Sequence, residues 1–336
     1  MTIQRNPTTA HAPPHLPLDV LRLIADELLS GITAPYEPRP ASDLLRPALV
    51  CKAWSSAFLG VLQNNVALAG DLDIGFWLAG AKRTPPRLVQ IVHLRNRSQV
   101  SVHGLRSLFA RCQGVEELGF GGAVNFDFNP EVFSSPGLAD LKSMTMPSTL
   151  FLPPSSAPPI FAFHLRHLHL ATIRQRTLLY LPSIITSSKD TLVSFRYGST
   201  WEGSEPGLAQ ALAPVQATLE AFHSENFLPH QPALGNFLRG CSHLRRFTCR
   251  APSVGLPVAL PSTLTTLVVT ESAYRVSLTL LSQAIQATPR LRLLLLYAPE
   301  TDHPDRLSVR KGGPELLALC KERGTTVYIQ GADHRT

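Results

Sequence analysis

Histidine and arginine side chains recur at alternate positions along several short apolar segments of this sequence. Guanidinium groups pair with carboxylates and phosphates through parallel hydrogen bonds, and imidazoles donate or accept single hydrogen bonds. These residue types therefore predict recognition of an anionic group more readily than bond-breaking chemistry. The residues concerned are His93, Arg95, His167, His169, Arg196, His223, Arg246 and Arg250.

A metal site is the first alternative for the histidines, because His164, His167 and His169 lie within six residues. On a strand, His167 and His169 would share one face while His164 would point elsewhere. No cysteine or carboxylate nearby completes a ligand set. We therefore expect neither a metal nor another cofactor.

The sequence carries none of the common catalytic signatures. The sequence contains no phosphate-binding P-loop, no G-x-S-x-G elbow, no H-E-x-x-H pair and no dinucleotide fingerprint. The glycines of Gly119-Phe120-Gly121-Gly122 are followed by no helix-opening pattern and are interpreted as a turn. The sequence therefore predicts a protein that is not an enzyme.

Five cysteines lie far apart, at Cys51, Cys112, Cys241, Cys249 and Cys320, without any C-x-x-C pair. This spacing suggests reduced thiols and a cytoplasmic or nuclear location. Residues 1–15 are polar and do not resemble a signal peptide. The longest apolar runs, such as 293–298, fall short of the roughly 20 residues that cross a bilayer, so no membrane association is expected.

Composition indicates a folded protein with a mildly basic surface. Hydrophobic residues make up 44% of the 336 residues, and the 29 prolines suggest many short elements separated by turns. The formal net charge is +7, but the 31 Lys and Arg residues are scattered, with no run longer than two. Nucleic-acid binders concentrate such charge in patches, so this scatter disfavours a nucleic-acid partner. A nucleic-acid-associated protein remains an open alternative.

The strongest pattern is a motif of one apolar residue, two variable residues and then alternating apolar residues. It recurs nine times, at intervals of 20 to 27 residues, within the range of roughly 20–29 residues of leucine-rich repeats. A weaker earlier copy lies near 71–77, and a final strand is expected over 326–329. The motifs start at Val89, Val115, Leu138, Leu165, Leu192, Leu219, Leu244, Leu264 and Leu291.

Segments with helical spacing separate the motifs, at 102–112, 176–187, 208–217, 233–241, 277–287 and 314–322. The junctions Arg111-Cys112-Gln113-Gly114-Val115 and Gly240-Cys241-Ser242-His243-Leu244 resemble the cysteine-containing leucine-rich repeats of F-box proteins. Cys112 and Cys241 are thus expected to be small buried residues at helix ends. The prediction is an α/β fold, a right-handed solenoid with a parallel sheet on its concave face.

If the motif leucines point inward, alternation along each strand brings the histidines and arginines listed above to the concave face. We expect this face to bind a protein target. The hypothesis is that it prefers an acidic or phosphorylated peptide, with Arg196, Arg246 and Arg250 as anion contacts. The alternative is that these residues are ordinary solvated strand positions.

The first sixty residues contain two apolar segments of a different kind. Residues 16–29 have helical spacing, with Pro17 suited to a first turn, and 42–58 form a second apolar segment. Helices of this size cannot enclose a core alone, so exposed apolar surface and a partner are expected.

The opening Leu16-Pro17-x-Asp19-Val20-Leu21-x-x-Ile24 and the closing Leu49-Val50-Cys51-Lys52-x-Trp54 resemble the F-box motif. The resemblance implies docking on the Skp-family adaptor of cullin–RING ubiquitin ligases, and a role as the substrate-recognition subunit. The long segment 30–41 and Pro47 within the second apolar segment depart from the family pattern. The implied contacts are Leu16, Pro17, Val20, Leu21, Ile24, Leu44, Leu45, Val50, Cys51 and Trp54.

The alternative is a leucine-rich-repeat interaction scaffold whose F-box is degenerate and acts only as a helical cap. In either case the expected organisation is a disordered segment over 1–14, an F-box-like helical module over 15–60, a leucine-rich-repeat-like solenoid over 61–330 and a flexible tail over 331–336.

Overall fold

The computed structural model divides the chain into two compact units, Met1–Asn64 and Asn65–Thr336. The second unit contains nearly all the residues whose structure can be described. The described residues are 17, 20–21, 24, 65–68, 70–81, 87–94, 100–120, 127–128, 130–146, 150–151, 160–173, 175–200, 204–225, 232–252, 254–272, 275–298 and 306–331.

In the first unit, Val20, Leu21 and Ile24 are helical, and the Leu21 N–H donates to the Pro17 carbonyl at 3.1 Å. Leu21 is buried, with 1% of its surface exposed, whereas Val20 is 38% exposed. Ile24 is half-buried and Pro17 is exposed. The other implied adaptor contacts lie outside the described residues, namely Leu16, Leu44, Leu45, Val50, Cys51 and Trp54.

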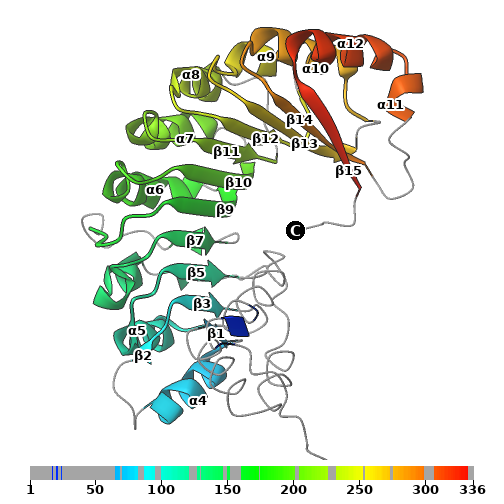
Figure 1. The fold of residues 1–336 in the computed structure, drawn as a ribbon. Coiled ribbons are helices and arrows are strands. Elements are labelled where there is room, and N and C mark those ends of the chain that lie inside the picture. The colour runs from blue at the N-terminus through cyan, green and yellow to red at the C-terminus, as the bar shows by residue number, and fades with distance from the viewer. Residues whose placement is uncertain are drawn as a thin grey trace, which may run out of the picture. The chain divides into compact units, whose positions relative to one another are not determined.

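The second unit is built on one sheet of eleven parallel strands (Figure 1), in which each strand pairs with the next one along the chain. Parallel neighbours require a crossover between them, so the backbone winds in successive coils. The strands are β1 (Asn65–Leu68), β3 (Ile91–Leu94), β5 (Glu117–Phe120), β7 (Ser143–Met146), β9 (His167–Ile173), β10 (Ser194–Thr200), β11 (Ala221–Ser224), β12 (Arg246–Cys249), β13 (Thr266–Ser272), β14 (Leu293–Ala298) and β15 (Thr326–Gly331).

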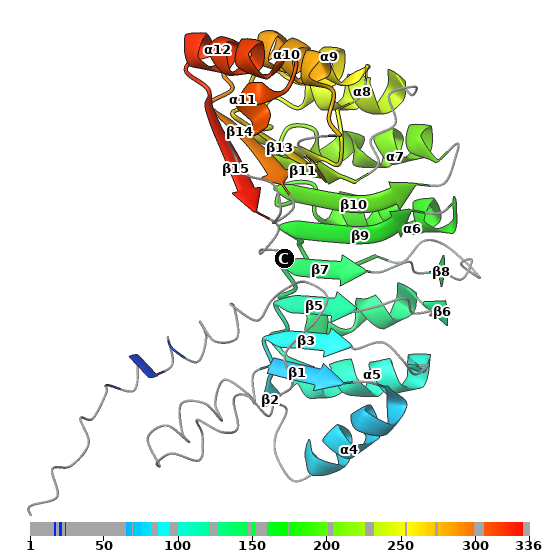
Figure 2. The ribbon, with the colours of Figure 1, turned by 90° about the vertical axis from the view of Figure 1, so that its right-hand side faces the viewer.

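The crossovers place helices along one side of this sheet (Figures 1 and 2). Not every coil has a full helix. The described residues of the coil from β5 to β7 form a two-residue strand (Asp127–Phe128) and 3₁₀ turns, and the shortest motif interval, from Leu244 to Leu264, leaves room for the four residues of α9. The helices are α4 (Asp71–Ala81), α5 (Val102–Arg111), α6 (Gln175–Ser187), α7 (Glu205–Leu212), α8 (Pro232–Gly240), α9 (Leu256–Ala259), α10 (Leu278–Ala287), α11 (Arg306–Val309) and α12 (Gly313–Arg323), with 3₁₀ turns η1 (Pro130–Ser134), η2 (Pro136–Leu138) and η3 (Ala213–Val215).

The core lies between the sheet and the helices, because alternate strand residues and the first leucine of each motif point to this side. Phe195, Phe222 and Phe247 occupy paired positions on β10, β11 and β12 and are at most 1% exposed. The Phe222 ring centroid lies 5.8 Å from that of Phe195 and 6.0 Å from that of Phe247. The Phe222–Phe247 pair is stacked and the Phe195–Phe222 pair is tilted, and aromatic pairs of this kind add stabilisation beyond the area that they bury.

A second repeated contact joins consecutive coils through threonine hydroxyls. Thr191 Oγ1 donates to the Leu165 carbonyl at 2.9 Å, and Thr218 Oγ1 donates to the Leu192 carbonyl at 3.0 Å. Thr263 Oγ1 repeats the contact with the Leu244 carbonyl at 3.0 Å. Each threonine therefore satisfies a buried carbonyl that belongs to the preceding coil.

Two short strand pairs extend the coils beyond the main sheet, β2 (Arg87–Leu88) with β4 (Cys112–Gln113) and β6 (Asp127–Phe128) with β8 (Leu150–Phe151). At the other end, β15 continues to Gly331, which pairs with Ala298. The first residue of the expected flexible tail is therefore part of the sheet. Residues 332–336 lie outside the described residues.

Candidate functional site

The face of the sheet that points away from the helices is here called the open face (Figure 1). Strand alternation and pairing place most of the predicted target-binding residues on it. Strand pairing aligns them in two rows that cross the strands. His167, Ser194, Ala221 and Arg246 stand in one row, from β9 to β12. The second row contains His93, Gly119, Thr145, His169, Arg196, His223 and Thr248.

Arg196 lies at the centre of the second row, between His169 on β9 and His223 on β11. Its Nη2 donates to Glu225 Oε1 at 3.2 Å, and the His223 Nε2 lies 3.8 Å from the same oxygen. We call His169, Arg196, His223 and Glu225 the central cluster. Side chains from three neighbouring strands thus meet in one polar group.

Gly198 provides the space that this cluster needs. A Cβ at this position would lie 3.2 Å from Glu225 Oε2 and 2.5 Å from the Ala171 carbonyl oxygen. Gly119 acts similarly next to His93, since a Cβ there would meet the His93 ring. His93 in turn lies 3.8 Å from Glu117 Oε1. Glycine is therefore required at position 198, where the close atom is a backbone oxygen, whereas a side chain at position 119 would displace the His93 ring.

The two histidines of the central cluster are held neutral at physiological pH. Burial, followed by the charge of Arg196, lowers the pKa of His169 to about 4. Burial, with Arg196, His169 and Arg246 nearby, lowers the pKa of His223 to about 3 despite the Glu225 carboxylate. Burial and the neighbouring Arg166 also lower the pKa of His167. The imidazoles thus supply hydrogen-bonding groups and not positive charge.

The central cluster leaves polar atoms without partners. Arg196 Nε and His223 Nε2 are shielded from solvent and make no hydrogen bond within the described chain. A buried polar atom left unpaired costs roughly 1–3 kcal/mol. Apolar side chains at these strand positions would avoid that cost, so the stability of the sheet does not account for the cluster.

The three arginines expected to bind anions differ in their surroundings. Arg250 Nε donates to Glu271 Oε2 at 2.8 Å, and Arg196 is paired with Glu225. Arg246 makes no ion pair within the described residues. Among the described residues of this face, three arginines (Arg196, Arg246 and Arg250) are matched by three glutamates (Glu117, Glu225 and Glu271). The open face therefore has little net positive charge.

The open face becomes apolar towards the C-terminal end of the chain, which the sequence pattern did not predict. Val268 on β13, Leu295 on β14 and Tyr328 on β15 are neighbours in the second row. Leu293 lies in the first row, and Tyr328 is 56% exposed. The signal was present in the sequence, because four consecutive leucines over 293–296 on an alternating strand must place two on each face.

The remaining predicted residues fall as follows. His169 faces the open side but is only 9% exposed, and Arg95 lies outside the described residues. His164 Nδ1 lies 2.7 Å from the Ser187 carbonyl, off the open face. Within the part of the chain that the structure describes, no three His, Cys, Asp or Glu residues are grouped to hold a metal.

Cys112 and Cys241 are buried at the ends of α5 and α8, which confirms the sequence prediction for both positions. Burial raises the pKa of each thiol to about 12. Thiols are nucleophilic in their ionised form, so these two cysteines are inert packing residues.

The fold and this surface define an α/β protein in which a parallel sheet of successive strands has helices on one side and an open face on the other. Comparison of the sequence with models of protein families and with curated proteins gave no match. Among the described helices, none has the length and apolar character required to span a bilayer.

Proposed function

We propose that this chain is an adaptor that binds a target protein on the open face of its sheet. The observation that carries the proposal is that two surfaces lie side by side on the open face. One is the central cluster on β9–β11, whose unpaired buried polar atoms destabilise the fold, and the other is the apolar area on β13–β15. Protein interfaces combine apolar anchors with polar groups that fix orientation in this way.

The finer architecture is part of the same proposal. The motif interval and the threonine contacts between coils support a leucine-rich-repeat-like solenoid, and the residues at 16–24 and 49–54 support an F-box-like helical module. The chain would then be the substrate-recognition subunit of a Skp–cullin–F-box ubiquitin ligase. It would act by proximity, holding a target beside the ligase so that ubiquitin transfer becomes effectively intramolecular and the target is degraded.

A second candidate is an interaction scaffold that does not engage a ligase. The burial of Leu21 favours this candidate, since a residue expected to contact the Skp-family adaptor is covered in the structure. The N-terminal unit would then serve as a cap.

Co-purification of the full chain with a purified Skp-family adaptor distinguishes the two candidates. Val20→Asp is the sharper probe because Val20 is 38% exposed, whereas Leu21→Asp would also disturb a buried position. The matched control is Val258→Asp, because Val258 on α9 is 68% exposed and lies in the second unit. A stable complex lost only in Val20→Asp supports the ligase adaptor. Failure of the wild-type chain to bind the adaptor refutes that part and leaves the scaffold.

The target-binding part is tested separately with Tyr328→Asp on the open face and Val309→Asp on α11, where Val309 is 81% exposed. Proteins cross-linked to the wild-type chain in cell extract are compared with those of both variants by mass spectrometry. We expect one set of partners to be lost with Tyr328→Asp and retained with Val309→Asp. Equal retention by both variants would show that the open face is not the binding surface.

A further inference from the structure

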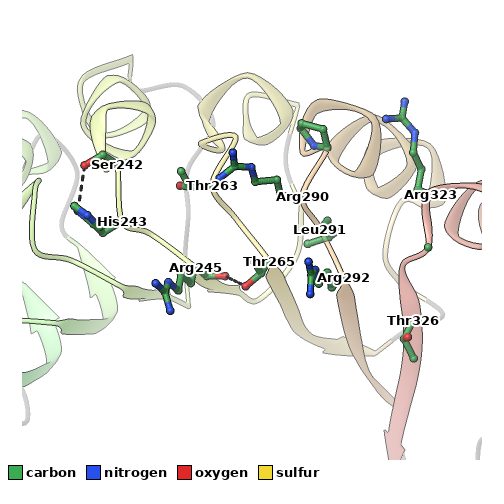
Figure 3. Close-up of a pocket in the computed structure, with 12 residues that line it drawn as sticks. Ser242, His243, Arg245, Thr263, Thr265, Arg290, Leu291, Arg292, Arg323 and Thr326 are labelled. Atoms are coloured by element: carbon green, nitrogen blue, oxygen red, sulfur yellow. Dashed lines mark hydrogen bonds between the residues drawn. The ribbon is translucent and has the colours of Figure 1, made fainter.

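A second surface, separate from the open face, lies at the end of the sheet where the strands begin and is rich in arginine. The turns that lead into β12, β13, β14 and β15 line an open groove with a volume of about 1110 Å³. The described residues that line it include four arginines, Arg245, Arg290, Arg292 and Arg323, and no carboxylate. Figure 3 shows Arg290 and Arg292 on the turn before β14, and Arg245 on the turn two coils earlier.

These arginines are available to a ligand. All four are exposed, and none of their guanidinium groups makes an ion pair or hydrogen bond within the described residues. The contrast with the open face is direct, since Arg196 and Arg250 are both neutralised there by glutamates.

Helix ends reduce the charge of the groove without cancelling it. The C-termini of α8, α10 and α12 lie beside lining residues His243, Pro289 and Gly324. Each helix C-terminus carries roughly −0.5 of an elementary charge, so together they offset less than half of the four positive charges. The groove keeps a net positive charge that calls for an anionic ligand.

The dimensions of the groove match a short peptide. Four neighbouring strands at about 4.8 Å spacing span roughly 14 Å, the length of four or five extended residues at about 3.3 Å each. The positive stretch ends there, because β15 is the last strand of the sheet and Glu220 precedes β11 next to Arg245. The forked guanidinium groups suit carboxylates and phosphates equally.

A nucleic-acid strand fits these features less well. Single strands bind through aromatic side chains on which bases stack, and the described residues that line the groove include no Phe, Tyr or Trp and a single histidine, His243. A positive stretch of about 14 Å also contacts only a few phosphates, which gives weak and salt-sensitive binding.

We infer that this groove binds a short acidic segment of a partner protein, whose carboxylates or phosphates are held by Arg245, Arg290 and Arg292. This site is distinct from the proposed target surface and requires no ligase component. It would give the chain a second attachment point for a partner, and two linked contacts bind far more tightly than either alone.

Fluorescence anisotropy on the full chain tests the inference with labelled probes at low salt. The probes are hexaglutamate, a peptide alternating glycine and phosphoserine, hexaglutamine as the neutral control, and hexauridylate RNA. We expect one or both acidic peptides to bind at least tenfold more tightly than hexaglutamine, and the tighter one identifies carboxylate or phosphate as the preferred anion. Equal binding of acidic and neutral peptides, or tenfold tighter binding of the RNA than of either acidic peptide, overturns the inference.

Variants locate the site. Arg245→Glu with Arg292→Glu should weaken acidic-peptide binding at least tenfold. Arg166→Glu is the matched control, because Arg166 is an exposed arginine immediately before β9, outside the groove, and should change affinity less than twofold. Arg245→Lys with Arg292→Lys keeps the charge, loses the forked geometry and should weaken binding several-fold. Unchanged affinity in the glutamate double variant refutes the site, and unchanged affinity in the lysine double variant refutes recognition by the guanidinium forks.

Discussion

Replacing His223 by glutamine should reduce the acid sensitivity of this protein. Charged and titratable groups lie close to the His223 ring: Arg196 on β10 and Arg246 on β12 from the two neighbouring strands, Glu225 after β11, and His169 on β9, one strand further away. Burial and the three cationic or imidazole neighbours lower the pKa of His223 from 6.5 to about 3. In the unfolded chain the imidazole regains its ordinary pKa.

The direction of the effect follows from proton binding. Below about pH 6.5 His223 is protonated in the unfolded state. In the folded state it stays neutral until the pH approaches 3. The free energy of unfolding is therefore not reduced by His223 well above pH 6.5, and it decreases progressively as the pH falls below that value. Between pH 7 and pH 5, linkage gives a loss of about 2 kcal/mol for a single group of this kind.

Urea unfolding followed by far-UV circular dichroism at pH 7 and pH 5 measures this loss. The wild-type chain should lose about 2 kcal/mol more between the two pH values than His223→Gln, because all other titrating groups contribute to both proteins. Ser194→Ala, a substitution of a half-buried residue on the same face, should keep the wild-type pH dependence. A His223→Gln chain that loses as much stability on acidification as the wild type would refute the argument.

Two further predictions concern packing. Phe222→Ala should destabilise the second unit by about 3–5 kcal/mol in the same urea assay, because Phe222 is 1% exposed, whereas Phe76→Ala on α4, at 76% exposure, should change stability by less than about 0.5 kcal/mol. Gly198→Ala should lower stability because its Cβ would lie 2.5 Å from the Ala171 carbonyl oxygen, and Gly75→Ala on α4 should raise it by about 0.5–1 kcal/mol, since no atom lies within 4 Å. Equal effects within either pair would contradict the packing described here.

The sheet could be predicted from the sequence because its spacing is imposed by burial. The motif starting at Leu192 predicted a strand within 192–197, and the structure has β10 over Ser194–Thr200. Helix prediction was equally direct where amphipathic spacing and an N-cap coincide, as at Ser277, whose hydroxyl accepts from the Leu280 N–H. The threonines before Leu192, Leu219 and Leu264 were a further signal of the same repeat that the apolar pattern did not use.

The electrostatics of the surfaces could not be predicted in the same way. Arg196 and Glu225 are 29 residues apart, and Arg250 and Glu271 are 21 residues apart. Because coil lengths vary from 20 to 27 residues, the side chains that become neighbours across strands follow only from the strand register. For the same reason Arg245 and Arg292 lie far apart in the sequence but line one groove.

These two surfaces should respond differently to salt, which provides a way to assign any partner to one of them. The central cluster combines neutral histidines with an arginine that is already paired, so a partner on the open face gains little from long-range attraction. The groove keeps unpaired arginines, and exposed charges are screened beyond roughly 10 Å at 0.1 M salt. A partner held mainly by the groove should therefore dissociate as salt rises, and Arg245→Glu, which leaves three of the four arginines in place, should weaken that dependence. A partner held by β13–β15 should remain bound, because burial of apolar surface around Leu295 and Tyr328 does not weaken with ionic strength.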